Sequence, residues 1–310
     1  MRLVFFGTPE FAVPSLRALG EEGFDVAAVV TQPDRPKGRH RTELIPSPVK
    51  VQALEEKLPV LQPVRPNERD FLNQLRELAP DLGIVVGYGH ILKPTLLEVP
   101  ALGLINVHAS LLPKFRGAAP IEHAILNGAD ETGVSIMQLD AGMDTGPVYL
   151  RVTTPIAPDE NAGELTTRLA ELGALALIEA LSLIASGAAD SEPQDESAAS
   201  YAPKLTIEMA KIDWTDSAQT ISRQVRALDP RVGARTSHRG RMVKLFGPRP
   251  ADVWAKDNTP GEIIEADPAL VVATGSGALQ FLDVQPEGRQ RMAATAWIRG
   301  RGAVKGECFV

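Results

Sequence analysis

Apolar runs alternate with amphipathic stretches along the first two thirds of the chain. Short continuous apolar runs predict strands buried on both faces, and apolar residues at helical spacing predict helices. The predicted strands cover residues 3–7, 25–32, 81–89, 103–110, 132–139 and 148–156, and the predicted helices cover 11–23, 48–57, 67–80, 117–128 and 164–187. This alternation predicts an α/β fold with a doubly wound, mostly parallel sheet.

The pattern changes after residue 187. Residues 188–200 are acidic, small and proline-containing, which is typical of a linker. Short β-rich runs then follow a predicted helix near 217–228 and are separated by Pro, Gly and Asp, a spacing that predicts a small OB-like β-barrel. We therefore expect an α/β domain over residues 1–189, a linker over 190–206 and a C-terminal β-barrel over 207–310.

The composition of the 310 residues limits the class of protein. The single Cys308 excludes an intramolecular disulfide and a cysteine-based zinc cluster, and the histidines show no metal-ligand spacing, so we expect no metal. Gly7 and Pro9 come too early for a signal peptide, and the apolar runs fall short of the ~18–20 residues of a membrane span. We expect a cytoplasmic protein without a membrane partner, and a monomer because no long exposed apolar surface is evident.

The net charge of −7 is unevenly distributed. Residues 209–310 hold 15 Lys and Arg against 11 Asp and Glu, whereas residues 1–208 hold 17 against 28. A basic appendage on an acidic enzyme is typical of phosphate or nucleic-acid binding, although a solvated basic face has the same composition. The segment 34–41 adds four basic residues on a chain interrupted by Pro36 and Gly38, which favours a mobile loop that orders on RNA.

The turn after the first predicted strand does not fit a dinucleotide site. After Gly7, the fingerprint G-x-G-x-x-G fails because Pro9 and Ala12 stand where glycines are needed. Pro9 also removes a backbone N–H, and Glu10 would repel a pyrophosphate. An oxidoreductase is therefore disfavoured.

Candidate chemistry gathers at predicted strand ends, where open α/β sheets bind their ligands. Residues two apart in a strand point the same way, so Asn106 and His108 share a face, and their N–H groups form a donor pair suited to an oxyanion. Asp144 lies in a glycine-bracketed loop after the next strand and would stabilise a cationic imidazole. Each residue alone is more often structural, but together they favour acyl transfer. A serine hydrolase using Ser110 is disfavoured because no G-x-S-x-G elbow occurs.

These residues belong to a recognisable signature. Residues 106–113 read N-V-H-A-S-L-L-P, which resembles the N-x-H-G-S-L-L-P signature of the formyltransferases that use 10-formyltetrahydrofolate. The resemblance extends over nearly the whole chain, in the segments FFGTPEFAVPSL (5–16), TQPDRPKGR (31–39), PSPVK (46–50), LPKFRGAAPI (112–121), TGVSIMQLDAGMDTG (132–146), YAPKL (201–205) and KIDW (211–214).

The resemblance implies transfer of a formyl group from 10-formyltetrahydrofolate to the methionine of initiator methionyl-tRNA. It implies catalytic roles for Asn106, His108 and Asp144. It also implies two sets of binding residues. The folate-binding set is Tyr88, Gly89, Ile91, Leu92, Ser110, Leu111, Leu112, Pro113 and Asp140, and the tRNA-binding set is Arg35, Lys37, Arg39, Arg41, Lys204 and Lys211. The C-terminal barrel would contact the same tRNA.

The sequence departs from the family pattern at two places. Ala109 replaces the glycine of the signature and adds a methyl group where the backbone nears the cofactor, so we expect a small shift in folate affinity. Asp229 and Arg231 replace an asparagine and a tryptophan that flank Pro230 in the family, which affects the expected contacts between barrel and RNA.

Two alternatives remain open from the sequence. The same fold with the same three catalytic residues serves formyltransferases that act on a small amine, such as a glycinamide ribonucleotide or an amino-sugar nucleotide, and these would not need the basic segments. A folate- or RNA-binding protein without catalysis is the other alternative. The presence of all three catalytic residues argues against it.

Overall fold

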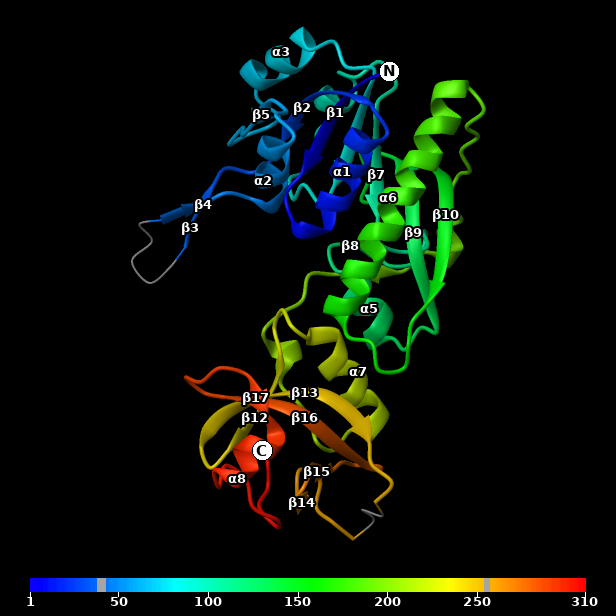
Figure 1. The fold of residues 1–310 in the computed structure, drawn as a ribbon. Coiled ribbons are helices and arrows are strands. Elements are labelled where there is room, and N and C mark those ends of the chain that lie inside the picture. Colours follow the sequence, from blue (N-terminus) through cyan, green and yellow to red (C-terminus); the bar gives the residue numbers. More distant parts are fainter. Residues whose placement is uncertain (38–42, 254–256) are drawn as a thin grey trace. The chain divides into compact units, whose positions relative to one another are not determined.

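The computed structural model describes residues 1–37, 43–253 and 257–310, which form two compact units. Unit 1 comprises residues 1–120, 132–154 and 166–202, and unit 2 comprises residues 121–131, 155–165 and 203–310. Unit 1 contains the predicted α/β sheet, and unit 2 contains the predicted C-terminal sheet (Figure 1).

Unit 1 is built on a seven-stranded sheet with the order β10-β9-β7-β6-β1-β2-β5. The strands are parallel from β7 to β5, and β9 pairs antiparallel with β7, which confirms the predicted mostly parallel sheet. The bounds are β1 (Arg2–Gly7), β2 (Asp25–Val30), β5 (Val60–Leu61), β6 (Leu82–Val86), β7 (Leu104–His108), β9 (Glu131–Gln138) and β10 (Val148–Pro155).

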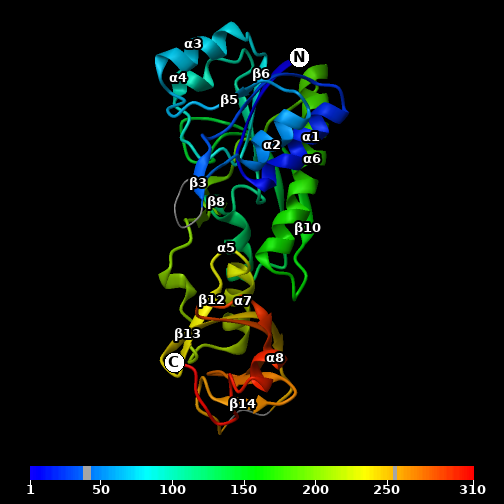
Figure 2. The ribbon, with the colours of Figure 1, turned by 60° about the vertical axis from the view of Figure 1, so that its left-hand side comes forward.

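Helices cover both faces of this sheet. In Figure 2, α3 and α4 lie on one face, and α1, α2 and α6 lie on the other. Side chains of β1 alternate accordingly: Val4 and Phe6 pack in a core cluster with Phe71 and Leu75 of α3. The bounds are η1 (Glu10–Ala12), α1 (Val13–Glu21), α2 (Pro48–Glu55), α3 (Arg69–Glu77), α4 (Pro94–Leu97) and α6 (Ala162–Ser186).

Helix α6 is the one helix in the described ranges that is long and apolar enough to cross a membrane, by length and composition only. The expectation that no stretch of the chain is long and apolar enough was therefore wrong. Glu171 and Glu179 interrupt the apolar run in the sequence, but both lie inside the helix and do not end it. One face of the helix, which includes Leu165, Leu169 and Leu177, is buried, and 44% of its most apolar window is buried.

Unit 2 contains an antiparallel sheet with the order β12-β13-β16-β15-β14, and β17 pairs with β16. The predicted helix near 217–228 is α7. The bounds are α5 (Pro120–Leu126), η3 (Glu208–Ala210), α7 (Ala218–Leu228), β12 (Ala234–His238), β13 (Arg241–Pro250), β14 (Ile263–Ala266), β15 (Leu270–Ala273), β16 (Ala278–Pro286), β17 (Met292–Ala293) and α8 (Ala294–Arg299).

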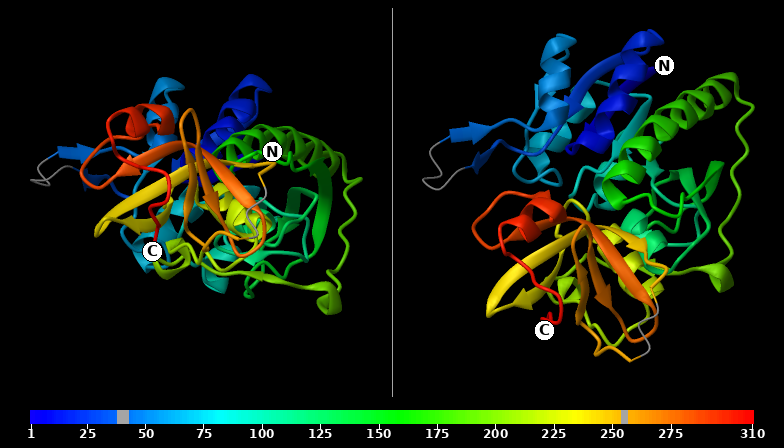
Figure 3. Two further views of the ribbon diagram at one scale, coloured as in Figure 1. Left: turned by 90° about the horizontal axis from the view of Figure 1, so that it is seen from below. Right: turned by 60° about the horizontal axis from the view of Figure 1, so that its bottom comes forward.

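The last residues of the chain close this sheet. Ile263 at the start of β14 donates its N–H to the Glu307 carbonyl at 2.8 Å, and Ser237 of β12 exchanges two backbone hydrogen bonds of 2.9 Å with Val310. The segment 307–310 thus joins the two edge strands, and the red trace in Figure 3 can be followed to this position. Phe309 packs inside beside Trp214, so the predicted barrel has a closed wall and an aromatic core.

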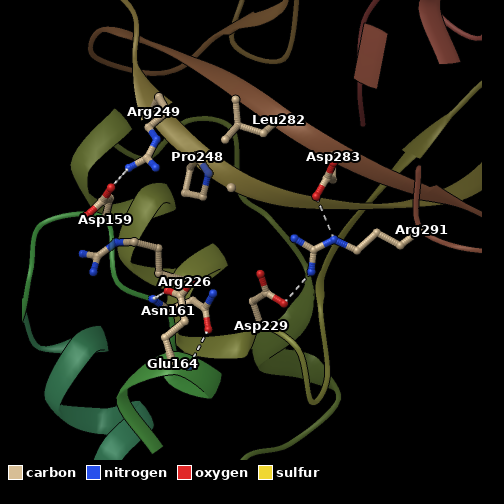
Figure 4. A pocket seen from close by; sticks show the side chains of 11 residues that line it. Asp159, Asn161, Glu164, Arg226, Asp229, Pro248, Arg249, Leu282, Asp283 and Arg291 are labelled. Carbon is tan, nitrogen blue, oxygen red and sulfur yellow. Dashed lines mark hydrogen bonds and ion pairs between the residues drawn. The ribbon is translucent and has the colours of Figure 1, made fainter. Parts of the chain in front are cut away.

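A charged cavity of about 150 Å³ lies within unit 2 (Figure 4). Arg249 pairs with Asp159, and Arg291 donates to Asp229 at 2.8 Å and to Asp283 at 3.0 Å. These pairs connect the 155–165 segment and α7 to β13 and β16, as Figure 4 shows. Asp229, one of the two departures from the family pattern, is buried in this network, so its carboxylate has a structural partner.

Candidate active site

Strand β7 places the predicted donor pair at its carboxyl end. Val107, between the two, faces α6, because a Cβ on Gly173 of α6 would lie 2.9 Å from Val107 Cγ1. Asn106 and His108 therefore share the opposite face, as the strand period predicts. Both side chains are buried, with 9% and 6% exposure. Within the described residues the Asn106 amide has no hydrogen-bond partner, which leaves its N–H groups available to a ligand.

The His108 ring is held between a carbonyl and a carboxylate. Its Nε2 lies 3.1 Å from the Phe115 carbonyl oxygen, and its Nδ1 lies 3.8 Å from Asp144 Oδ2. Since a carbonyl oxygen only accepts, the hydrogen in the first contact belongs to Nε2. In the neutral ring, Nδ1 is then the free acceptor, and it is the nitrogen beside Asp144. The structure thus brings His108 and Asp144 together, although they are 36 positions apart in the sequence.

Asp144 is fixed by its backbone as well as its side chain. It has a φ of 55°, in the left-handed region that aspartate tolerates better than most residues. Its Oδ2 accepts the Gly117 N–H at 2.8 Å. Earlier in the same loop, Asp140 Oδ1 accepts the Gly142 N–H and the Thr145 hydroxyl, at 2.9 and 2.8 Å. The Asp140 carboxylate therefore shapes the loop that carries Asp144.

The predicted folate signature forms the turn after β7. Ser110 is fully buried, and its hydroxyl donates to the Lys114 carbonyl at 2.6 Å. Leu112 is buried in a small apolar cluster with Met137 and Val148, while Leu111 and Pro113 are half-buried. The side chains of Ser110 and Leu112 therefore fix the shape of the turn from inside.

The predicted folate-binding residues between Tyr88 and Leu92 follow β6. Tyr88 is 1% exposed and packs edge-on against Phe6 in the core, and its carbonyl accepts the Gln32 amide at 2.9 Å. Gly89 is exposed, Ile91 is 87% exposed, and Leu92 is half-buried. The surface that this segment offers to a ligand consequently comes from Gly89, Ile91 and Leu92, whereas Tyr88 supports it from below.

Tyr88 permits a stability test. Its hydroxyl is buried without a hydrogen-bond partner among the described residues, and burial raises the pKa of Tyr88 to about 12. We expect Tyr88→Phe to raise the free energy of unfolding by ~1 kcal/mol at pH 7, because it removes a desolvated hydroxyl. Between pH 10 and pH 12 the folded protein keeps the Tyr88 hydroxyl proton, whereas the unfolded chain loses it. The free energy of unfolding of the wild type therefore falls across this range by up to ~3 kcal/mol more than that of the variant, which has no hydroxyl to titrate.

Urea unfolding of the two proteins at pH 7 and pH 11 checks both parts of this expectation. The KM for 10-formyltetrahydrofolate, the substrate that the sequence resemblance implies, is the control, since we expect a core-facing hydroxyl to leave it unchanged. A variant that is less stable at pH 7, or that binds folate more weakly, would show that the Tyr88 hydroxyl has a partner.

The predicted tRNA residues are distributed over both units. Arg35, in β3 (Arg35–Lys37) of unit 1, hydrogen-bonds through its guanidinium to Gln32 Oε1. β3 pairs with β4 (Glu43–Ile45), and Lys37 ends β3, while Arg39 and Arg41 lie outside the described residues. Lys204 and Lys211 are exposed in unit 2.

Sequence reasoning missed a second set of residues that contact the site. Residues 194–202, which were expected to belong to a linker, instead belong to unit 1 and pack against other segments of it. Arg116 is fully buried and donates to Gln194 and Glu196, and Gln194 donates to the Asp144 carbonyl at 2.8 Å. The expectation of a linker was wrong for these residues, because their acidic, small-residue composition does not reveal that a buried arginine lies opposite.

Two family models match the chain. The formyl transferase model covers residues 1–181, and the model of the formyl transferase C-terminal domain covers residues 204–302. The chain therefore belongs to the formyl transferase family. It is similar to the methionyl-tRNA formyltransferase of Moorella thermoacetica, with 47% identity over 99% of this chain and 98% of that protein. It is also similar to the methionyl-tRNA formyltransferase of Geobacter sulfurreducens, with 44% identity over 97% of this chain and 94% of that protein.

Solved structures share the fold at lower identity. The N-formyltransferase from Helicobacter canadensis, in complex with folinic acid and dTDP-3-aminofucose, matches with a TM-score of 0.71 at 20% identity, over 94% of this chain and 100% of that chain. HypX from Aquifex aeolicus matches with a TM-score of 0.70 at 21% identity, over 99% of this chain, which spans 50% of the length of HypX. At these identities the likeness concerns the fold.

Proposed function

We propose that this enzyme transfers the formyl group of 10-formyltetrahydrofolate to the α-amino group of methionine on initiator methionyl-tRNA, for translation initiation. The observation that carries the proposal is the 47% identity to a methionyl-tRNA formyltransferase over 99% of the chain, because it includes unit 2 as well as the sheet. A cytoplasmic location follows from this substrate, and we propose that the enzyme acts as a monomer.

Asn106 and His108 would stabilise the charge that develops during transfer. Attack of the neutral amine on the formyl carbon places negative charge on the formyl oxygen. The Asn106 amide is a neutral donor for this oxyanion and needs no change of protonation. In the neutral His108, Nδ1 carries no hydrogen, because Nε2 holds it toward the Phe115 carbonyl. His108 therefore first accepts a proton from the attacking amine, and then donates from Nδ1 as a cation.

Asp144 would support this cation. At 3.8 Å its Oδ2 is too far from Nδ1 for a direct hydrogen bond, but near enough for attraction between the charges. The separation also leaves Nδ1 accessible to the reacting groups or to a bridging water. Gly117 holds the carboxylate in position through its N–H. The proton would finally pass from His108 to the departing N10 of the folate.

The folate substrate would lie between the exposed part of the 88–92 segment and the loop from Asp140 to Asp144, beside the turn at 110–113. The 88–92 segment follows β6, which is parallel to β7, so it lies at the carboxyl end of β7, where open α/β sheets bind their ligands. Asp144 reaches the same end of β7, because its carboxylate lies beside His108. HypX has been solved in complex with tetrahydrofolic acid, and it shares this fold with a TM-score of 0.67. Across the described residues, no group of three or more His, Cys, Asp or Glu side chains is placed to hold a metal, and we propose that the reaction needs none.

We assign catalysis to the α/β domain, and contact with tRNA to the C-terminal barrel domain and the segment 34–41. The basic excess of residues 209–310 supports this division, since phosphates attract such a surface. Lys211 lies near the start of this range and Lys204 lies just before it, and both side chains are exposed.

A charge-removal variant tests the tRNA surface. We expect the double variant Lys204→Ala/Lys211→Ala to bind tRNA more weakly and to lose ~1.4–1.8 from the slope of log affinity against log salt, about 0.7–0.9 per phosphate contact. Folate affinity should not change. Titrations of tRNA at several salt concentrations provide the measurement, and Arg17→Ala, on the exposed side of α1, is the matched control. An unchanged slope would assign these lysines to a solvated face.

The direct test of function compares acceptors. Purified enzyme and 10-formyltetrahydrofolate are incubated with methionyl initiator tRNA, with a glycinamide ribonucleotide or with a dTDP-amino sugar. The proposal is supported if methionyl-tRNA is the only one of these three acceptors that is formylated. Formylation of a small amine supports the other open possibility, and no transfer to any of them supports a binding protein without catalysis.

A further inference from the structure

We propose that residues 194–202 complete the active site, with Gln194 as a positioning residue that holds Asp144 in place for catalysis. This inference rests on the proposed function. It extends the catalytic part of the chain beyond residue 189, where the sequence pattern ends the α/β domain. The 194–202 segment lies wholly within unit 1, so all the contacts in the argument belong to one compact unit.

The first contact is a short parallel pairing. β11 (Tyr201–Ala202) pairs with β8 (Arg116–Gly117), and Arg116 donates its N–H to the Ser200 carbonyl at 2.8 Å. The Ser200 hydroxyl in turn accepts the Phe115 N–H at 2.9 Å. The segment thereby fixes the backbone from Phe115 to Gly117.

This fixed backbone holds both members of the catalytic pair. The Phe115 carbonyl contacts His108 Nε2, and the Gly117 N–H donates to Asp144 Oδ2. Phe115 has a φ of 59°, which is unfavourable for a bulky residue unless neighbouring contacts maintain it. The bonds from Ser200 to Phe115 and Arg116 supply such contacts.

The second contact reaches the Asp144 loop directly. Gln194 Nε2 donates to the Asp144 carbonyl at 2.8 Å and to the Gly146 carbonyl at 2.7 Å. Both N–H groups of one amide are thus used on the loop that carries the carboxylate. Because Asp144 has the left-handed φ of 55°, bonds to its own carbonyl and to the Gly146 carbonyl limit the backbone conformations open to this loop.

A buried arginine holds Gln194 in turn. Arg116 is 0% exposed, and it donates to Gln194 Oε1 from Nε and Nη2, at 3.1 and 2.9 Å. Nη1 and Nη2 of the same guanidinium also donate to the Glu196 carboxylate, at 2.9 and 2.7 Å. The amide oxygen of Gln194 therefore faces only donors, so its NH₂ group is directed at the loop. These contacts form a chain that leads from Glu196 through Arg116 and Gln194 to Asp144.

Two variants of the full-length enzyme test the assignment. We expect Gln194→Leu to lower kcat ~10- to 100-fold with the KM values for both substrates within about three-fold, because the catalytic geometry is disturbed and not the binding surfaces. Gln194→Glu should be similarly impaired: its carboxylate still accepts from Arg116 but has no N–H for the two carbonyls. Gln74→Leu, at an exposed position of α3, is the matched control and should retain wild-type kinetics.

A double-mutant cycle separates positioning from general support of the fold. If Gln194 acts through Asp144, Gln194→Leu should cost less than about three-fold in kcat when Asp144 is already asparagine. Full additivity of the two effects would overturn the proposal. So would a Gln194→Glu enzyme with wild-type kcat, since that result would reduce Gln194 to a partner of Arg116.

Amide hydrogen exchange gives a readout that does not depend on the reaction. In Gln194→Leu, exchange should accelerate in residues 140–147 and 115–118 and stay unchanged in the β1 and β6 amides. If wild-type enzyme fails to formylate methionyl-tRNA, the proposed function fails while the exchange result still decides whether the segment orders the site. Unchanged exchange in both segments would overturn the positioning role.

Discussion

Removal of either member of the donor pair should lower kcat for formyl transfer by more than ~100-fold, the usual effect of deleting one oxyanion donor. His108→Ala removes the group proposed to accept the amine proton, and Asn106→Ala removes the neutral donor on the same strand face. Affinity for tRNA should stay within about three-fold of wild type, because neither side chain belongs to the proposed tRNA surface. Single-turnover formylation of methionyl-tRNA, together with a tRNA titration, provides both values.

His123→Ala is the matched control for this pair. His123 lies on α5 in unit 2, where its Nε2 contacts the Pro203 carbonyl at 3.0 Å, and it has no proposed part in catalysis. It should keep kcat within about three-fold of wild type. Near-normal turnover of the Asn106 or His108 variant would exclude that residue from the oxyanion role.

Asp144→Asn should lower kcat by at least ~10-fold, because an amide keeps the shape of the carboxylate but loses the charge that supports a cationic His108. The backbone is expected to hold, since the Asn oxygen still accepts the Gly117 N–H and the loop keeps its bonds to Gln194. KM values for both substrates should therefore change little. The measurement is the full kinetic analysis of variant and wild type.

Asp140→Asn is the useful comparison, because Asp140 lies in the same loop and, among the residues that the structure describes, its carboxylate bonds only to Gly142 and Thr145 of that loop. Asp140→Asn weakens hydrogen bonds inside the loop but leaves the charge beside His108 in place, so its effect on kcat should be smaller. Turnover of Asp144→Asn within about two-fold of wild type would make Asp144 a structural residue.

Much of the molecule could be predicted from local pattern. Apolar runs at strand length and amphipathic stretches at helix length identified the sheet of unit 1, because burial on one or two faces leaves a period in the sequence. The period of two also placed Asn106 and His108 on one strand face, and the structure confirms this through the opposite orientation of Val107. The short helix α4 escaped prediction, since four residues carry no periodic signal.

The sequence by itself determined the order of the main strands and helices, the presence of a C-terminal β domain and the identity of the candidate catalytic residues. Only the tertiary structure decided which nitrogen of His108 is free, because that depends on the Phe115 carbonyl seven positions away. It also decided that Arg116 is buried and that Gln194, 50 positions beyond Asp144, reaches the Asp144 loop. Contacts between distant segments depend on how the chain packs, and a polar segment such as 194–202 leaves no periodic trace of the partner it meets.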